Sequence, residues 1–336
     1  MSIPLIRLTM VLLVLLGGTL LSLTSSPGTV SRELEPRAHE ARETNYDSVR
    51  RAARRAQRRA DRQQRDRGAG GVAMLLATGD IASCDWKGDE ATADLLDRFD
   101  GTVITLGDLA YESGSRREFD RCYDASWGRH KDRTRPAPGN HEYKTNRAAG
   151  YFEYFGSAAG DPDKGYYSYD LGDWHIIALN SNCAEVGGCD ARSPQVQWLQ
   201  ADLRTAEAVC TLAYWHHPLF SSSKESFGTP EVRPMWKMLY RHGVDIVLSG
   251  HAHQYERFAP QDPMGRADPS RGIRQFVVGT GGANFHEFGS PQDNSEVRIA
   301  DTAGILKLLL RANAYTWRFV SVGSRQNDEK GADDCH

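Results

Sequence analysis

The chain lacks the short motifs that would place it in several common protein classes. Its six cysteines include no CxxC pair, which argues against a zinc site built from cysteine thiolates. It has no P-loop, and the glycines of "VVGTGGANF" (residues 277–285) do not have the spacing of a dinucleotide-binding loop. No internal repeat is present. The chemistry of the chain therefore has to come from other residues.

The body of the chain also lacks an excess of positive charge. Residues 68–336 carry 28 basic and 37 acidic side chains, a net charge of −9 with histidine neutral. Because nucleic-acid binding requires a basic surface, this balance argues against a specific nucleic-acid partner. The total length of 336 residues and the apolar content of 40% are ordinary for one large globular domain.

Only one long apolar run is present, and it lies within residues 1–31. The run extends from Leu8 to Leu23, follows a single arginine and is followed by small residues, which is the layout of a signal peptide. About 17 apolar residues can also cross a membrane, so an N-terminal membrane anchor is the alternative. No cysteine follows the run, which argues against a lipoprotein anchor. We expect a secreted or extracytoplasmic protein.

The next segment, residues 32–71, is rich in arginine and polar on every side. Residues 32–67 contain twelve arginines and seven acidic residues, and "GAGG" then marks a linker. Such a segment cannot bury a core, so we expect a polar spacer. The alternative is contact with an anionic surface such as lipid headgroups or wall polymer. On that alternative the chain would be a surface-tethered, metal-bearing adhesion or sensor module.

From residue 72 onward, short β-rich segments alternate with helical ones. Segments 89–99, 193–206 and 231–243 have helical periodicity, the second with a cap at Ser193 and proline in its first turn. The expected strands are "VAMLLAT", "VITL", "WHIIALN", "CTLAYW", "VDIVLS", "RQFVVG", "ILKLLLRA" and "YTWRFV", the last two as a hairpin. This alternation predicts a layered α/β domain with partly parallel sheets over residues 72–322. Residues 323–336 read as a polar, solvated tail.

The six cysteines form an even set behind an export signal, which predicts disulfides. Cys183 and Cys189 enclose the short loop "CAEVGGC" and are the first expected pair. The remaining four allow three pairings, among which we favour Cys84 with Cys122 and Cys210 with Cys335.

Metal-binding side chains follow the expected strands at the point where each strand ends. Asp80 and Asp108 follow the first two strands, and two later strands lead to "HHP" at 216–218 and "GHAH" at 250–253. Asn140 and His141 lie in "PGNHE" between them. Open α/β sheets bind ligands at the carboxyl ends of their strands, so these loops should meet at one edge. A glycine before four of these residues fits a chain that turns sharply there.

The number of potential ligands distinguishes one metal ion from two. The oxygen and nitrogen donors, which suit zinc, iron or manganese, are Asp80, Asp108, Tyr111, Asn140, His216, His251 and His253. Seven donors are too many for one tetrahedral ion, whereas two ions that share a carboxylate would use them all. Two ions about 3.5 to 4 Å apart are suited to in-line displacement at phosphorus.

The ordered set "GD…GDLAY…GNHE…HHP…GHAH" resembles the calcineurin-like metallophosphoesterases, and the tyrosine of "GDLAY" is similar to that of the purple acid phosphatase branch. The resemblance covers roughly residues 72–320. It implies a four-layer αββα sandwich with two mixed β-sheets and a dinuclear site on its rim. It also implies that Asp80, Asp108, Tyr111 and His253 hold Fe(III), and that Asp108, Asn140, His216 and His251 hold iron, zinc or manganese.

The chain departs from the family pattern at two places. Ile81-Ala82 follows Asp80 where the wider family has a histidine two residues on, and Tyr111 would take the place of that ligand. The segment "FSSSKESFGTP" lacks the histidines that some plant members use near the leaving group. The general acid is therefore expected to be His141, with His217 as the second choice. The segment 277–285 is expected to line the rim of the site, and His286 directly after it reads, in the simplest interpretation, as an exposed loop histidine.

These features predict a secreted dinuclear-metal phosphatase that hydrolyses phosphomonoesters by attack of a metal-bound hydroxide. A phosphodiesterase or nucleotidase on the same metals is the alternative, because the metal pair does not choose between monoesters and diesters. The expected partner is a small phosphate ester, and no obligate protein partner is evident.

Overall fold

The computed structural model describes residues 71–323 and 329–336. The predicted leader (1–31) and all but the last residue of the arginine-rich segment (32–71) lie outside the described residues, so both remain predictions. Within the described ranges, no helix is both long and apolar enough to cross a bilayer.

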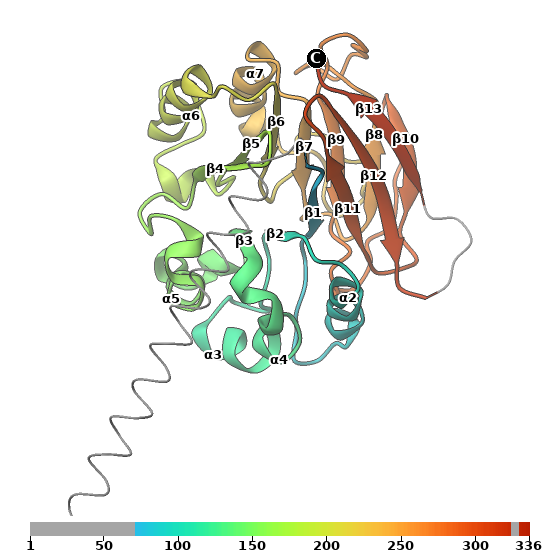
Figure 1. The fold of residues 1–336 in the computed structure, drawn as a ribbon. Coiled ribbons are helices and arrows are strands. Elements are labelled where there is room, and N and C mark those ends of the chain that lie inside the picture. Colours follow the sequence, from blue (N-terminus) through green and yellow to red (C-terminus); the bar gives the residue numbers. More distant parts are fainter. Residues whose placement is uncertain (1–70, 324–328) are drawn as a thin grey trace, which may run out of the picture. The chain divides into compact units, whose positions relative to one another are not determined.

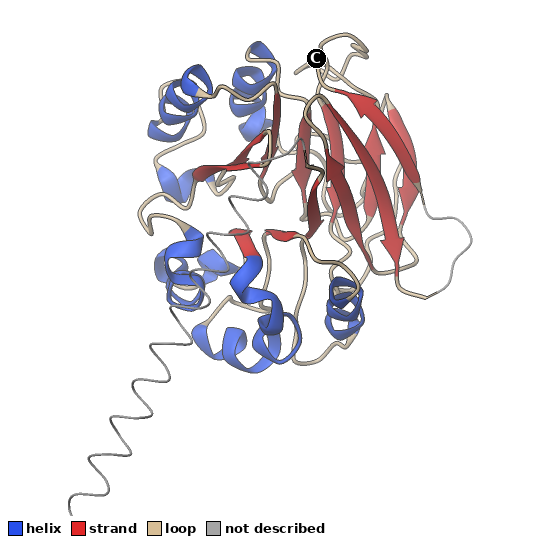
Figure 2. Cartoon of the chain, in the orientation of Figure 1, coloured by secondary structure: helices blue, strands red, loops and turns tan. Residues whose placement is uncertain are grey.

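Two mixed β-sheets form the centre of this part of the chain (Figure 1, Figure 2). The six-stranded sheet has the order β13 (Lys330–Asp334), β12 (Ala314–Ser321), β11 (Gly304–Leu310), β1 (Ala73–Thr78), β2 (Thr102–Leu106) and β3 (Thr134–Ala137). The seven-stranded sheet has the order β10 (Ser295–Ile299), β8 (Tyr255–Phe258), β9 (Arg274–Val278), β7 (Ile246–Ser249), β6 (Cys210–Tyr214), β5 (Trp174–Ala178) and β4 (Tyr167–Leu171). Strands β1 to β3 are parallel, as are β5, β6, β7 and β9.

Helices cover the outer face of each sheet. The helices beside the six-stranded sheet are α2 (Gly88–Asp97), α3 (Arg116–Glu118), α4 (Asp124–Ser126) and α5 (Ala149–Phe155). Those beside the seven-stranded sheet are α6 (Pro194–Thr205) and α7 (Arg233–Arg241). Leu96 of α2 packs with Val103 of β2, and Trp236 of α7 packs with Val247 of β7. The predicted four-layer αββα sandwich is confirmed.

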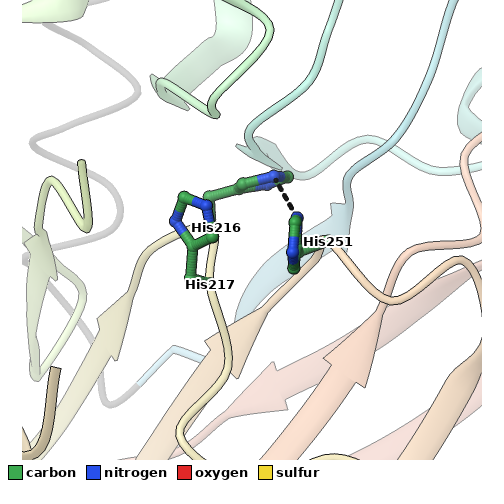
Figure 3. Close-up of side chains that lie close together, drawn as sticks. All are labelled: His216, His217 and His251. Atoms are coloured by element: carbon green, nitrogen blue, oxygen red, sulfur yellow. Dashed lines mark hydrogen bonds between the residues drawn. The ribbon is translucent and has the colours of Figure 1, made fainter. Parts of the chain in front are cut away.

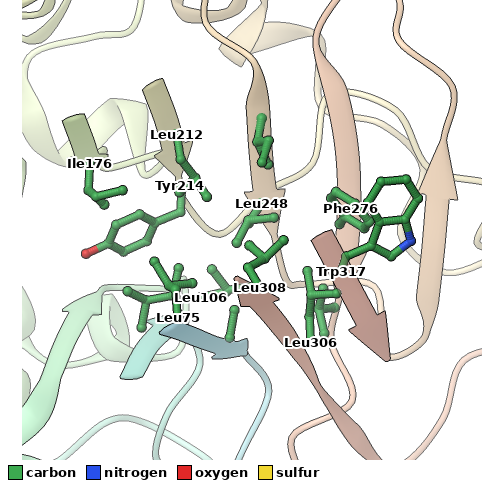
Figure 4. Close-up of a cluster of buried hydrophobic side chains, with 14 of the residues drawn as sticks. Leu75, Leu106, Ile176, Leu212, Tyr214, Leu248, Phe276, Leu306, Leu308 and Trp317 are labelled. Atoms are coloured by element: carbon green, nitrogen blue, oxygen red, sulfur yellow. The ribbon is translucent and has the colours of Figure 1, made fainter. Parts of the chain in front are cut away.

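The main apolar core lies between the two sheets (Figure 4). Side chains alternate between the faces of a strand, so Leu75 and Ala77 of β1 enter this core while Leu76 packs on the helix side. Leu106, Leu212 and other fully buried side chains fill the same layer. Each such side chain stabilises the fold by about 1.5–3 kcal/mol, which makes the sheets a firm support for the loops at their edges.

The predicted start of the second helix is confirmed. The Ser193 side-chain oxygen accepts a hydrogen bond from the Val196 backbone N–H at 3.3 Å, and Pro194 occupies the first turn of α6. This cap satisfies one of the backbone donors that a helix start leaves unpaired.

All three predicted disulfides are present: Cys84–Cys122, Cys183–Cys189 and Cys210–Cys335. The last of these holds the C-terminus against β6. Residues 330–334, which we expected to be a solvated tail, instead form β13 and pair with β12. The expectation was wrong for this segment because backbone pairing, rather than an apolar pattern, makes it a strand.

A buried histidine in β5 gives the fold a pH-dependent contribution to stability. His175 Nε2 lies 2.8 Å from Asp202 and its Nδ1 lies 3.0 Å from Asp170. Burial lowers the pKa of His175, but the two carboxylates outweigh that effect and raise the pKa above its usual 6.5. Because the raised pKa belongs to the folded state, this stabilisation is complete below pH 6.5 and is lost as the pH rises through the folded-state pKa.

We therefore expect His175→Gln to lower the free energy of unfolding by about 2 kcal/mol at pH 5 and by clearly less at pH 8.5. Urea unfolding of both proteins at the two pH values measures this difference. An equal or larger loss at pH 8.5 would contradict the assignment.

Candidate metal centre

The loops that follow five strands meet at one edge of the two sheets. Asp80 follows β1, Asp108 follows β2 and Asn140 follows β3, all in the six-stranded sheet. His216 follows β6 and His251 follows β7 in the other sheet. Because the strands concerned are parallel within each sheet, their carboxyl ends lie together, as the sequence predicted.

One group of predicted ligands gathers around the phenol of Tyr111. Its hydroxyl donates to Asp80 Oδ1 at 3.2 Å, lies 3.5 Å from Asp108 Oδ2 and lies 3.2 Å from His253 Nε2. His253 Nε2 is in turn 3.3 Å from Asp80 Oδ1. The structure therefore brings Asp80, Asp108, Tyr111 and His253 together.

The second group gathers around His216. Its Nε2 lies 3.2 Å from Asp108 Oδ2, 3.1 Å from Asn140 Oδ1 and 3.2 Å from His251 Nδ1. Figure 3 shows His216 and His251 joined by the last of these contacts, with His217 beside them. Asp108 belongs to both groups, and its carboxylate is almost completely buried.

Backbone carbonyls fix which ring nitrogen faces the centre. His216 Nδ1 lies 2.7 Å from the Leu106 carbonyl, and His253 Nδ1 lies 2.7 Å from the Asn284 carbonyl. A carbonyl can only accept, so both Nδ1 atoms carry a proton, and Nε2 is the ring nitrogen left to bind a metal ion once it gives up any proton of its own. This is the arrangement of a histidine that binds metal through Nε2. The Leu106 and Asn284 carbonyls left no signal in the sequence, because any residue provides one.

Three of the predicted ligand residues have a positive φ, a backbone conformation that we had expected of the glycines before them. Asp80, Asp108 and His251 have φ of 60°, 51° and 69°, a region that residues other than glycine rarely occupy. Gly139 is required for another reason, since a Cβ there would lie 2.2 Å from Asp108 Oδ1. The expected sharp turns are present, but the glycines serve largely to let backbone approach the ligands.

The carboxylates lie in a setting that favours a cation. No lysine or arginine forms an ion pair with Asp80 or Asp108 within the described residues, where their charged partners are histidines. Burial by itself raises the pKa of Asp108, but the charge and hydrogen bond of His216 outweigh it and hold the pKa below its usual value. Burial lowers the pKa of His216, and Asp108 raises it to about 9.

The phenol of Tyr111 keeps its proton unless a strongly charged cation binds its oxygen. Burial first, and then the charges of Asp80 and Asp108, raise the pKa of the phenol well above 10. A donor set of carboxylates, imidazoles, an amide oxygen and a phenol supplies the oxygen and nitrogen ligands that suit iron, zinc and manganese. The residues present therefore fit the implied metal pair.

The segment that departs from the family pattern supports Tyr111 through its backbone. The Ala82 N–H donates to the Leu109 carbonyl at 3.0 Å, and the Tyr111 N–H donates to the Ala82 carbonyl at 2.8 Å. Ile81 and Ala82 are fully buried, and neither side chain offers a ligand atom.

The two predicted proton donors lie at different sides of the centre. His141 Nε2 lies 3.8 Å from Asp108 Oδ2, while its Nδ1 donates to the Glu112 carbonyl at 2.7 Å. His217 Nδ1 lies 2.8 Å from the Ser181 hydroxyl, and its ring lies 4.5 Å from that of His251. Burial, followed by the charge of His216, lowers the pKa of His217 to about 3.

Two residues that support the site were not predicted to do so. Glu142 is fully buried and accepts hydrogen bonds from the backbone N–H groups of Asp108, Leu109, Ala110 and Gly139, at 2.9, 2.8, 3.4 and 2.7 Å. In the sequence, its place in "GNHE" directly after Asn140 and His141 was the one indication of a role at the site. His286 is not the exposed loop histidine that we expected, because its ring stacks on that of His253.

Comparison with known proteins agrees with this geometry. Residues 66–255 match the family of calcineurin-like phosphoesterases. Purple acid phosphatase 21 of Arabidopsis thaliana is 32% identical over 229 residues, which are 62% of this chain and 49% of the relative. The chain thus spans about half the length of this relative.

Two solved structures share the fold. A purple acid phosphatase from yellow lupin (Lupinus luteus) seeds has a TM-score of 0.66 at 19% identity, over 78% of this chain and 53% of its own. GAP50, the anchor in the inner membrane complex of Plasmodium, has a TM-score of 0.59 at 14% identity, over 79% of this chain and 89% of its own. The chain therefore belongs to the calcineurin-like phosphoesterase family, in which it resembles the purple acid phosphatase branch.

Proposed function

We propose that the protein is a metal-dependent phosphatase that hydrolyses small phosphomonoesters at a dinuclear centre. The observation that carries the proposal is the arrangement of seven candidate metal-binding side chains, from loops of two sheets, in two groups that share the buried carboxylate of Asp108. The names of the purple acid phosphatase relatives give independent support.

Two ligand sets follow from the contacts. Asp80, Asp108, Tyr111 and His253 would hold the first ion, and Asp108, Asn140, His216 and His251 would hold the second. Asp108 would be shared by both ions, because its Oδ2 faces both Tyr111 and His216. The phenol of Tyr111 favours Fe(III) in the first position, and iron, zinc or manganese suits the second.

When bound, the two ions supply positive charge to the phosphoryl oxygens and activate water as the nucleophile. His141 is placed to give a proton to the leaving oxygen, because its Nε2 faces the centre while its Nδ1 is held by the Glu112 carbonyl. The Lys144 amine, 3.3 Å from His141 Nε2, adds a positive charge at the same side and favours an anionic ester. His217, held by Ser181, was the second choice, but a pKa of about 3 leaves it without the extra proton that this role requires.

We also propose that the protein acts outside the cytoplasm. Three disulfides join all six cysteines, as is usual for proteins of oxidising compartments. The leader of residues 1–31 would direct this export, either as a cleaved signal peptide or as an anchor. Contact of the arginine-rich segment with an anionic surface remains a separate prediction.

Hydrolysis of p-nitrophenyl phosphate and of bis(p-nitrophenyl) phosphate by the purified protein tests the function. We expect faster turnover of the monoester, and a loss of at least about 100-fold after removal of metal with a chelator. Faster turnover of the diester would replace the proposal with a phosphodiesterase. No turnover of either ester by metal-loaded protein would favour a non-enzymatic role.

A further inference from the structure

His286 lies against the predicted ligand His253 from outside the ligand set. The two imidazole rings are stacked, with centroids 4.0 Å apart and planes inclined by 9°. The His253 backbone N–H donates to His286 Nδ1 at 3.2 Å, and the His286 backbone N–H donates to the His253 carbonyl at 3.1 Å. The two residues are therefore joined by a ring contact and by two hydrogen bonds.

The same segment also holds the other side of His253. The Asn284 carbonyl accepts the proton of His253 Nδ1 at 2.7 Å, two residues before His286. One short stretch of chain thus fixes both the tautomer and the plane of the His253 ring. With these restraints in place, His253 Nε2 points at Asp80 Oδ1 and the Tyr111 hydroxyl.

The role of His286 differs from that of a ligand. Its Nδ1 is occupied by the His253 N–H, and no contact joins its ring to Asp80, Asp108 or Tyr111 among the interactions of the described residues. The stack on His253 requires a flat ring, and the hydrogen bond from the His253 N–H requires an acceptor atom at the position of His286 Nδ1. Few side chains other than histidine offer both.

We propose that His286 is a positioning residue, which holds the His253 ring in the orientation that the first metal ion needs. The inference rests on the proposed function and assigns His286 to only one of the two ions. Outer partners of metal-binding histidines typically contribute about 10- to 100-fold to metal affinity. We expect an effect of about tenfold on the first ion and little effect on the second, since His286 contacts neither His216 nor His251.

The test is Zn²⁺ binding by metal-stripped, full-length protein in competition with a chelator of known affinity. Wild type is compared with His286→Ala, with His286→Phe, which keeps the flat ring, and with His286→Asn, which keeps an acceptor. The neighbouring exposed Phe285→Ala is the matched control. We expect about tenfold weaker binding of one Zn²⁺ in His286→Ala, smaller losses in the Phe and Asn variants, and wild-type binding in the control.

Equal binding of both ions by wild type and His286→Ala would overturn the inference and leave the proposed function intact. Loss of both ions to the same extent would also overturn it, because the effect would then not be specific to His253. A wild type that binds neither Zn²⁺ nor iron nor manganese would overturn both proposals. If His286→Ala folds poorly, the His286→Phe and His286→Asn variants test the inference instead. Both must then lose more affinity for the first Zn²⁺ than Phe285→Ala does.

Discussion

We expect replacement of Asp108 by alanine to abolish the proposed phosphatase activity, because Asp108 is the one proposed ligand that both metal ions would share. The Asp108 carboxylate is the only one in the two ligand groups that faces both Tyr111 and His216. A bound metal pair supplies several kcal/mol of stabilisation to the reaction, and each 1.4 kcal/mol corresponds to about tenfold in rate. We therefore expect a loss of at least about 1,000-fold in kcat/KM, together with loss of bound metal.

The fold should survive this substitution. Asp80, Asp108 and His216 place their ligand atoms within 4.8 Å of one another, so removal of one buried carboxylate also removes repulsion between two negative charges. Metal content by elemental analysis, turnover of p-nitrophenyl phosphate and thermal unfolding are measured on the same samples. Asp173→Ala, an exposed residue between β4 and β5, is the control. Wild-type turnover with unchanged metal content in Asp108→Ala would refute the bridging role.

Glu142→Gln is expected to have the largest effect on stability. The carboxylate of Glu142 accepts from four backbone N–H groups of the loops that carry Asp108 and Asn140. Burial and the charge of Asp108 raise the pKa of Glu142, and the N–H groups offset this rise only in part. A glutamine keeps one acceptor oxygen but turns two amide hydrogens toward the same donors, so at least one buried N–H is left without a partner.

We expect this substitution to cost about 3 kcal/mol or more, which corresponds to a fall in Tm of roughly 10 °C. Metal affinity should fall by about 10- to 100-fold as well, because both loops lose their common support. Calorimetry and metal competition measure the two effects, with the exposed Glu185→Gln as the control. A Tm close to that of wild type would show that Glu142 does not hold these loops.

The sequence was sufficient for the parts of the fold that depend on local patterns. Apolar runs gave the central strands, helical periodicity gave α2, α6 and α7, and the Ser193 cap is a local hydrogen bond. Five of the seven predicted ligands were recognisable because they follow a strand, and Tyr111 and His253 because they lie close behind two of these in "GDLAY" and "GHAH". Their contacts with one another agree with the expected grouping.

The edge strands were missed for physical reasons. Strand β3 has only four residues and includes Pro136, whose missing N–H is tolerated because β3 pairs on one side only. Strand β13 consists of "KGADD" and has no apolar pattern; β12 and the Cys210–Cys335 disulfide hold it in place. Strand pairing of this kind depends on neighbours far away in the sequence.

The supports of the ligands were missed for a related reason. The Leu106 carbonyl supports His216 only because the fold places that backbone atom beside the ring. His286 supports His253 only because a loop about 30 residues later in the chain returns to the His253 ring. Neither position differs in composition from an ordinary loop or strand end. Only the assembled fold shows which groups lie beside a ligand.

Elemental analysis of the purified protein, with its visible absorption spectrum, shows whether the protein holds a metal pair. We expect two metal ions per chain and, with Fe(III) in the first position, a tyrosinate absorption band that disappears in Tyr111→Phe. A protein that hydrolyses phosphate esters at full rate with only trace metal would rule out the proposed dinuclear centre.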